Sequence, residues 1–234
     1  MKEFKKLNSY RGRLSSAEIA EGMNFATTNA RRLAEDADIL LTSGRFPTAA
    51  SLACLSIEES GKVSILRQLA TATSDDEVKT AWKSYRSHTR KNVQWLLPQL
   101  AMQGARKLDD LRPLFDENSN HPHDLDHLKQ LGFYTDCLGN RQWSIPTSVI
   151  DEELSRMLVW TAKLLVSKKE ISIQEIDLWI LHVGPAPKND LPQMKQALMN
   201  WYSAMQEAGL KPQGINEMER FINEGVPFPK GIYA

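Results

Sequence analysis

The chain has 234 residues, of which 41% are hydrophobic and 25% are charged, a composition that is ordinary for a soluble globular protein. Its 29 basic residues balance 29 acidic ones, which excludes a strong overall attraction to nucleic acid or to an anionic membrane. The two cysteines, Cys54 and Cys137, are too few for a disulfide framework. The N-terminus lacks the apolar stretch of a signal peptide, and no later run of 18 uncharged apolar residues follows. We therefore expect a cytoplasmic protein that does not cross a membrane.

The first part of the chain predicts two long helices. Residues 1–14 form a basic lead-in, and Ser15 to Glu18 has the Ser-x-x-Glu pattern of a capping box. Apolar residues then recur at steps of three and four until Gly44, which predicts an amphipathic helix. Pro47 suits the first turn of the next helix, which is expected to run to about Ala72. This second helix is small and apolar on nearly every side, as expected of a central helix that other helices surround.

The middle of the chain predicts shorter elements. A second capping box, Ser74 to Glu77, opens a third helix that Pro98 should kink or end. A short helical piece is expected at about 105–115, followed by a polar loop at 116–122. Aromatic and β-branched residues on both sides of a Gly-Asn turn, between Leu131 and Pro146, predict a small β-hairpin.

The remaining elements are again helical. Helices are expected at about 147–168, from a third capping box at 172 to 182, at 192–208 and at 216–223, with a Pro-rich linker at 184–190. The sequence therefore predicts an all-α fold: a helical bundle with a small β-hairpin-like insertion and a C-terminal helical extension. We divide it into the lead-in 1–14, the bundle domain 15–183 and the extension 184–234.

Charged residues interrupt the apolar central helix. At 3.6 residues per turn Glu59 falls on the same stripe as Leu52 and Val63, so its carboxylate is expected to face the interior or a cleft. Glu58 lies one step round the helix and faces Lys62 at the i,i+4 spacing of an ion pair. A buried carboxylate needs a partner, because removing it from water costs several kcal/mol.

The third helix offers such partners in His88 and Lys91. If the second and third helices are antiparallel around a turn near residue 73, Glu59 and His88 lie about 14 and 15 residues from it, or ~21 to 23 Å at ~1.5 Å per residue. The two levels then coincide. A buried Glu beside a His is a common structural arrangement, but it can also be a general acid or base. The sequence leaves both interpretations open.

Other chemistry receives less support from the sequence. Paired Glu-x-x-His motifs of di-metal bundles are missing, as are Walker and dinucleotide-binding motifs, so no metal and no cofactor is expected. The segment His121 to His127 holds three histidines and two aspartates; a solvated helix start is favoured there over a metal site. Basic residues mixed with aromatic ones, among them Lys83 and Arg86, suit either a nucleic-acid backbone or an ordinary solvated face.

Three sequence blocks follow one another along the chain. The first runs from Ala49 to Lys62 and contains Glu-Glu-x-Gly-Lys. The second is Ser-His-x-x-Lys at Ser87 to Lys91, and the third is Lys-x-x-Gly-Phe-Tyr-x-Asp at Lys129 to Asp136, followed by Trp143 and Pro146. With these blocks the chain resembles, over roughly residues 17–180, the AbiV family of abortive-infection proteins, which is similar to the all-helical HEPN group.

The resemblance implies a bacterial phage-defence protein in the cytoplasm, a helical bundle that forms a homodimer and shuts down host or phage gene expression. It also implies RNA or the translation machinery as targets and a phage protein as a possible trigger. Many HEPN proteins are metal-independent ribonucleases with an Arg-x4-6-His motif. This sequence departs from that motif, and its nearest approach is Lys83-x4-His88.

These observations combine into one hypothesis, a polar pocket with catalytic and binding residues. The catalytic candidates are Glu58, Glu59, Lys62, His88 and Lys91, and the binding candidates are Lys83, Arg86, Lys129, Tyr134 and Asp136. As an enzyme, the pocket would cleave RNA with His88 as acid or base and Lys62 or Lys91 on the phosphate. As a binding module, the chain would capture a phage or translation component on its surface. In the third interpretation, the network is a structural polar core.

Overall fold

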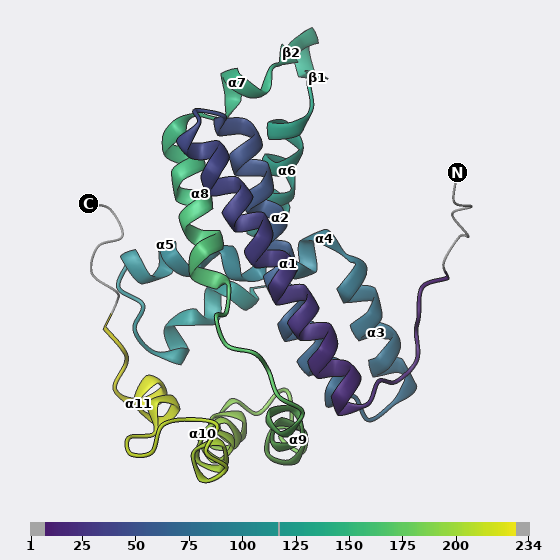
Figure 1. Cartoon of the computed structure of the whole chain (residues 1–234), viewed down its shortest axis with the longest axis vertical. Helices are drawn as coiled ribbons and strands as arrows, with labels where there is room; N and C mark the ends of the chain where they lie inside the picture. Colours follow the sequence, from purple (N-terminus) through teal and green to yellow (C-terminus); the bar gives the residue numbers. More distant parts are fainter. Residues whose placement is uncertain (1–7, 117, 228–234) are drawn as a thin grey trace.

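The computed structural model describes residues 8–116 and 118–227. It confirms the all-α prediction, because helices make up most of this part of the chain and a single two-stranded hairpin is added to them (Figure 1). Residues 1–7 of the lead-in and 228–234 of the extension lie outside the described residues. The α-helices are α1 (Ser16–Thr42), α2 (Phe46–Ala70), α3 (Asp75–Arg86), α4 (His88–Lys91), α5 (Leu97–Met102), α6 (His121–Phe133), α7 (Pro146–Val149), α8 (Glu152–Leu165), α9 (Ile173–His182), α10 (Leu191–Glu207) and α11 (Glu217–Asn223). The 3₁₀ helices are η1 (Val93–Leu96), η2 (Leu108–Phe115) and η3 (Gly139–Arg141).

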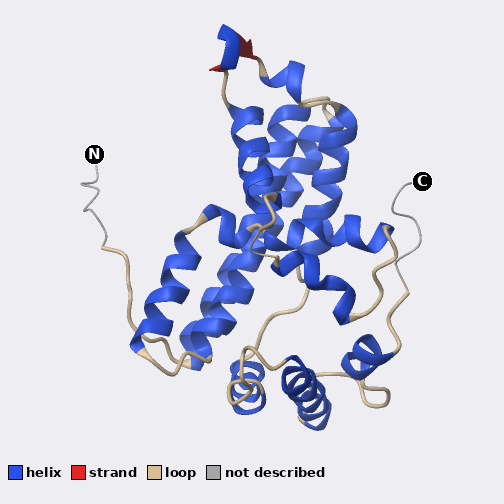
Figure 2. Cartoon of the chain, turned by 180° about the vertical axis from the view of Figure 1, so that it is seen from behind, coloured by secondary structure: helices blue, strands red, loops and turns tan. Residues whose placement is uncertain are grey.

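The predicted central helix is α2, which packs against α1, α3, α4, α6 and α8. Its partner α1 starts at the predicted capping box. Ser15 Oγ accepts a hydrogen bond from the Glu18 amide, and the Glu18 carboxylate accepts one from the Ser15 amide. The turn after α1 uses Gly44 at a φ of 71°, a left-handed conformation that glycine adopts without strain. The two helices then run side by side along the molecule (Figures 1 and 2).

Three apolar clusters hold the helices together. The first joins α1, α2, α6 and α8: Ala34, Ala37, Ala49, Ala50, Ala53, Cys54, Ile57, Leu125, Ile150, Leu158, Val159 and Ala162. The second lies at the other end of α1 and α2, against α3 and α9: Ile19, Ala20, Met23, Leu66, Leu69, Ala72, Val78, Ala81, Trp82, Ile171 and Ile176. The third, around Val183, Trp201 and Met205, joins α9 and α10. Small alanines fill the first cluster, which lets long helices approach closely.

The predicted third helix is wrong in one respect, since it ends at Arg86 instead of reaching Pro98. Ser87 has extended backbone angles (φ −80°, ψ 130°) and its hydroxyl accepts from the Arg90 amide, so it caps a new short helix, α4. A 3₁₀ turn and α5 follow, and Pro98 lies in the first turn of α5, where proline is tolerated. The chain therefore changes direction directly before His88.

The predicted helix at 147–168 is likewise divided. Ile150 and Asp151 are extended, and the Asp151 carboxylate accepts from the Leu154 amide at 2.9 Å to start α8. The other predicted elements are confirmed within a few residues, including the helical pieces of the extension and the linker between α9 and α10.

The predicted hairpin is also confirmed. Strands β1 (Asp136–Leu138) and β2 (Gln142–Ser144) pair antiparallel, with Cys137 opposite Trp143. The hairpin projects from the end of the bundle that lies opposite α9, α10 and α11 (Figure 1). Its side chains are mostly exposed, so it adds little to the core.

Within the described residues, no helix combines the length and apolarity required to span a bilayer. The division into lead-in, bundle domain and extension stays a prediction. Its second boundary falls within the loop between α9 and α10, two helices that share the third apolar cluster.

Candidate functional site

The carboxylate of Glu58 lies at the junction of α2, α4 and α6. Its side chain is 4% exposed, and three side chains from the other two helices contact it. Its Oε2 is 2.8 Å from His88 Nδ1 and 3.5 Å from Lys91 Nζ, and its Oε1 is 2.6 Å from Lys129 Nζ. We call Glu58, His88, Lys91, Lys129 and Asp126 the junction cluster. The buried charge of Glu58 is thus balanced by neighbouring cations, which offset the cost of removing the carboxylate from water.

The structure corrects the choice between the two glutamates. Glu58 is the buried one, whereas Glu59 is only partly buried and forms an ion pair with Lys62 at 2.6 Å and i,i+3 spacing. The predicted Glu58–Lys62 pair is therefore wrong. The Lys62 ammonium lies 5.2 Å from the centre of the Tyr85 ring, which fixes the Glu59–Lys62 pair beside the junction cluster.

The prediction that His88 and Lys91 pair with a carboxylate of the central helix is confirmed, although this carboxylate belongs to Glu58 and not to Glu59. The two residues face the same oxygen because the cap at Ser87 starts α4 beside α2. They differ in exposure: the His88 side chain is 59% exposed, and that of Lys91 is 7% exposed. His88 therefore lies between the buried carboxylate and solvent, while Lys91 contacts the same oxygen from within the protein.

Lys129 joins the same carboxylate from α6, and Asp126 accompanies it. Lys129 Nζ lies 2.6 Å from Glu58 Oε1 and also 2.6 Å from Asp126 Oδ1, one helical turn earlier. Lys129 was among the predicted binding residues, but its contact with Glu58 was not expected, and Asp126 was missed as a member of the cluster. The Asp126–Lys129 spacing of three is a signal that could have indicated this pair.

Two glycines allow the helices to deliver these groups. A Cβ on Gly61 would lie 2.0 Å from the carbonyl oxygen of Lys91, so α4 can approach α2 only because this position has no side chain. A Cβ on Gly132 would lie 2.2 Å from Ser51 Oγ, which donates to the Lys129 carbonyl at 3.1 Å. Both glycines belong to the sequence blocks noted above. The sequence blocks therefore contain the glycines that allow close helix contact as well as charged residues of the junction cluster.

The electrostatics of the two lysines differ. Burial lowers the pKa of Lys91, and the nearby Glu58 carboxylate opposes this effect only in part. Burial also acts to lower the pKa of Lys129, but hydrogen bonds to Asp126 and Glu58 outweigh it, and the pKa is raised above its ordinary value. Lys129 is therefore a stable ammonium ion between the carboxylates of Glu58 and Asp126. Burial and the charge of Glu58 raise the pKa of the neighbouring Cys54 thiol, so this buried cysteine stays protonated.

The other predicted site residues lie apart from this carboxylate. Tyr134 and Asp136, two of the predicted binding residues, are exposed at the start of the hairpin and do not contact the Glu58 carboxylate. The Asp136 amide instead donates to Ser144 Oγ in the hairpin. Lys83 is exposed on α3, and the Arg86 guanidinium donates to the backbone of Trp82 and Tyr10.

Ligand atoms of Glu58, His88 and Asp126 lie within 4.8 Å of one another, a spacing that a metal ion could use. The ammonium of Lys129 already contacts an oxygen of both carboxylates, so a side-chain cation takes the place that a metal would require. In the His121–His127 segment, His121 is buried and its ring nitrogens face Ser119 Oγ and the Val93 carbonyl. His123 and His127 are exposed near the start of α6.

In a comparison with family models, the model described as AbiV matches residues 18–167. Searches of curated proteins and of solved structures gave no match. The matched segment covers 150 of the 234 residues and contains the whole junction cluster. The chain therefore belongs to the AbiV family of HEPN-like proteins, and this membership suggests a role in abortive-infection defence against phage.

Proposed function

We propose that this protein restricts phage growth by acting on RNA, with His88 as the acid–base group. One observation carries the proposal: an imidazole that is 59% exposed has its Nδ1 2.8 Å from a carboxylate that is 4% exposed. With the ring hydrogen on Nδ1, the Glu58 carboxylate accepts its hydrogen bond, and Nε2 is left as the basic nitrogen of this exposed ring. A histidine oriented in this way by a buried carboxylate is a recurring general base.

The reaction that suits this arrangement is cleavage of RNA by its own 2′-hydroxyl. His88 Nε2 takes the proton of a ribose 2′-OH, whose oxygen attacks the adjacent phosphorus. The bond from phosphorus to the 5′-oxygen breaks, and that oxygen takes a proton from water. The His88 imidazolium then gives its proton to the hydroxide that is left, which restores the base. The products are a 2′,3′-cyclic phosphate and a 5′-hydroxyl end, so the reaction needs no oxidant or further substrate.

The cations near His88 have two different roles in this proposal. Lys91 and Lys129 are buried against Glu58, so they hold the carboxylate in place and do not reach a phosphate. Lys83, Arg86 and Arg90 are exposed on α3 and α4 and are the better candidates for the RNA backbone. The departure from the Arg-x4-6-His motif is thereby compensated by cations of the same surface segment. Formation of a homodimer, which the family resemblance implies, is part of this proposal.

The proposal is tested with purified protein and a fluorophore-quencher RNA of mixed sequence. His88→Ala should abolish cleavage, and the matched control His123→Ala, at an exposed histidine of α6 outside the cluster, should retain it. Mass spectrometry should find 2′,3′-cyclic phosphate ends. Cleavage that is absent in the wild type, or equal in His88→Ala, overturns the enzymatic proposal. For the dimer, a monomer whose sedimentation does not change with concentration is the contrary result.

One observation favours a second candidate, a non-enzymatic interaction module. Around the hairpin, Tyr134, Trp143 and Ile145 are 62%, 72% and 54% exposed, respectively. Exposed apolar groups of this size are typical of protein-binding surfaces. In this case the junction cluster is structural, and the partner is a phage protein or a component of translation. Loss of phage protection in Trp143→Ala at equal protein abundance, with protection kept in His88→Ala, would favour the module.

A further inference from the structure

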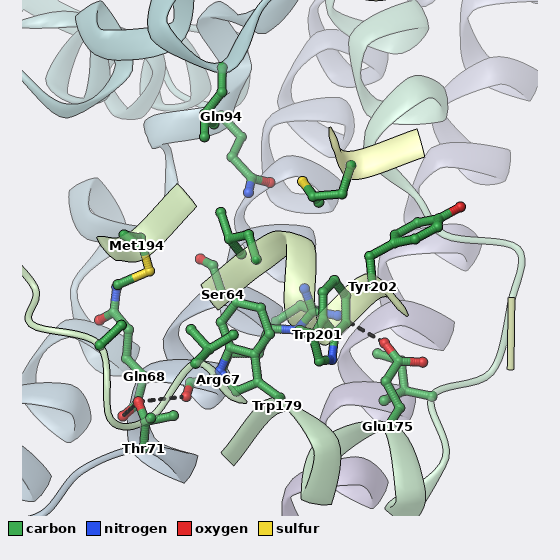
Figure 3. A pocket seen from close by; sticks show the side chains of 18 of the residues that line it. Ser64, Arg67, Gln68, Thr71, Gln94, Glu175, Trp179, Met194, Trp201 and Tyr202 are labelled. Atoms are coloured by element: carbon green, nitrogen blue, oxygen red, sulfur yellow. Dashed lines mark hydrogen bonds and ion pairs between the residues drawn. The ribbon is translucent and has the colours of Figure 1, made fainter. Parts of the chain in front are cut away.

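The ammonium of Lys129 contacts more than one partner in an ordinary ion pair would. In the pair that joins α2 to α9, for comparison, the Arg67 guanidinium lies 3.0 Å from the carboxylate of Glu175 (Figure 3). Lys129 Nζ lies 2.6 Å from Glu58 Oε1 and also 3.4 Å from His88 Nδ1. This last contact is important, because His88 Nδ1 is the same atom that lies 2.8 Å from Glu58 Oε2.

His88 Nδ1 therefore has two neighbours of opposite character. The ionised Glu58 carboxylate can only accept a hydrogen bond, and the Lys129 ammonium can only donate one. If Nδ1 carries the hydrogen of the neutral ring, it donates to Glu58, and Nε2 is the basic nitrogen. If Nδ1 has no hydrogen, it accepts from Lys129, the hydrogen is on Nε2, and the basic nitrogen faces the junction cluster. The two hydrogen bonds exclude each other, so the stronger one determines the tautomer.

Asp126 favours the hydrogen bond from His88 to Glu58. Its Oδ1 lies 2.6 Å from Lys129 Nζ, so two carboxylate oxygens bind the ammonium at distances much shorter than the 3.4 Å to His88 Nδ1. Charge-assisted hydrogen bonds of this length are the strong ones. The negative charge of Asp126 also offsets that of the ammonium, which would otherwise repel an N–H group at Nδ1.

We propose that Asp126 is a positioning residue for His88. By holding the Lys129 ammonium away from Nδ1, it keeps the ring hydrogen on Nδ1 and leaves Nε2 as the base. Asp126 acts through Lys129 and takes no part in proton transfer itself. The use of the ring as a base rests on the function proposed above, whereas its tautomer depends only on contacts within the junction cluster.

The test measures the tautomer by long-range ¹H–¹⁵N NMR of the full-length protein labelled at histidine, at a pH at which the His88 ring is neutral. The spectrum of His88→Ala identifies the signals of this ring. The wild type should carry the hydrogen on Nδ1. Asp126→Asn keeps the size of the side chain but removes its charge, and should move the hydrogen to Nε2 in most molecules. The matched control Asp124→Asn, at an exposed aspartate of α6, should keep the wild-type tautomer.

A second substitution separates this role from a general weakening of the fold. Lys129→Met removes the competing donor, so adding it to Asp126→Asn should return the hydrogen to Nδ1, although the double variant has lost a further charge. RNA cleavage should follow the tautomer. It should be about tenfold slower in Asp126→Asn, because a ring without a basic Nε2 cannot act as the general base, and should recover in the double variant. A purely structural role predicts that the double variant is the slower one.

The possible results distinguish this proposal from the proposed function. If the wild-type ring carries its hydrogen on Nε2, or if Asp126→Asn leaves it on Nδ1, Asp126 does not have this role. A folded double variant that keeps the hydrogen on Nε2 also overturns the proposal, because Lys129 is then not the competing group. If the tautomer changes as expected but the wild type does not cleave RNA, the proposed function fails and the role of Asp126 stands. Melting temperatures measured in parallel identify the variants that are folded.

Discussion

Replacing Lys129 by methionine removes one charge from the junction cluster and keeps a long apolar side chain. The Glu58 carboxylate, 4% exposed, then loses the ammonium that lies 2.6 Å from its Oε1. Removing one partner of a buried ion pair typically costs ~3–5 kcal/mol. His88 and Lys91 still contact Oε2, at 2.8 and 3.5 Å. We therefore expect a smaller loss of unfolding free energy, about 2–3 kcal/mol at pH 7.

Urea denaturation followed by circular dichroism measures this loss. The matched control is Lys163→Met, which removes an exposed ion pair to Asp38 of 2.9 Å and should cost at most about 1 kcal/mol. In a Glu58→Gln background, the Lys129 substitution should cost clearly less than in the wild type, because no buried carboxylate is left unpaired. The reasoning is refuted if Lys129→Met costs no more than Lys163→Met, or if the Glu58→Gln background leaves its cost unchanged.

Two further predictions concern helix contact and pH. Gly61→Ala should destabilise the fold by about 2 kcal/mol or more, because the new Cβ meets the Lys91 carbonyl. The control Gly22→Ala, in α1, should be neutral or stabilising by up to ~1 kcal/mol. Equal urea midpoints for the two variants would contradict this prediction. A hydrogen bond from Lys188 and those at the helix start lower the pKa of Glu77 from 4.5 to about 2. Its stabilising effect is present above pH 4.5 and is lost as the pH falls toward 2. The difference in melting temperature between wild type and Glu77→Gln should shrink over that range, and a constant difference would show that Glu77 is not the titrating group.

Local sequence signals predicted most of the helices. Capping residues at Ser15, Ser74 and Ser172 mark real helix starts, and the apolar repeats give their lengths. The break at Ser87 was missed because the apolar residues at helical spacing up to Tyr85 resume at Val93, after the polar run 86–92. Its cause is a single hydroxyl that caps α4. A cap inside a periodic segment cannot be distinguished by periodicity alone.

The choice of Glu59 over Glu58 has a different cause. A helix that is apolar on nearly all sides has no single buried stripe, so the helical wheel does not decide which face the neighbours cover. The positions of α4 and α6 decide it, and they place Glu58 inside and Glu59 beside Lys62. The match in height between His88 and the central glutamates was nevertheless useful, because it depends only on the rise per residue.

The part of α6 in the junction cluster was the least predictable. Lys129 lies 71 residues from Glu58 along the chain, and no local pattern relates the two. Only the packing of α6 on α2, which Gly132 permits, brings them into contact. The contacts of the Arg67 guanidinium with the rings of Trp179 and Trp201 were equally hidden, since they join α2 to α9 and α10, which come much later in the chain.

The second apolar cluster has a consequence for any shortened form of this protein. Ile171 and Ile176 lie beyond the segment that matches the family model, yet both are buried against Ile19, Met23 and Leu66. A chain cut after residue 167 would leave the ends of α1 and α2 without this cover, at a cost of ~1.5–3 kcal/mol for each large side chain exposed. Such a fragment would tend to self-associate through the bared surface. The matched segment and α9 should therefore be expressed together: a deletion after residue 167 would keep every residue of the junction cluster and still expose this apolar surface.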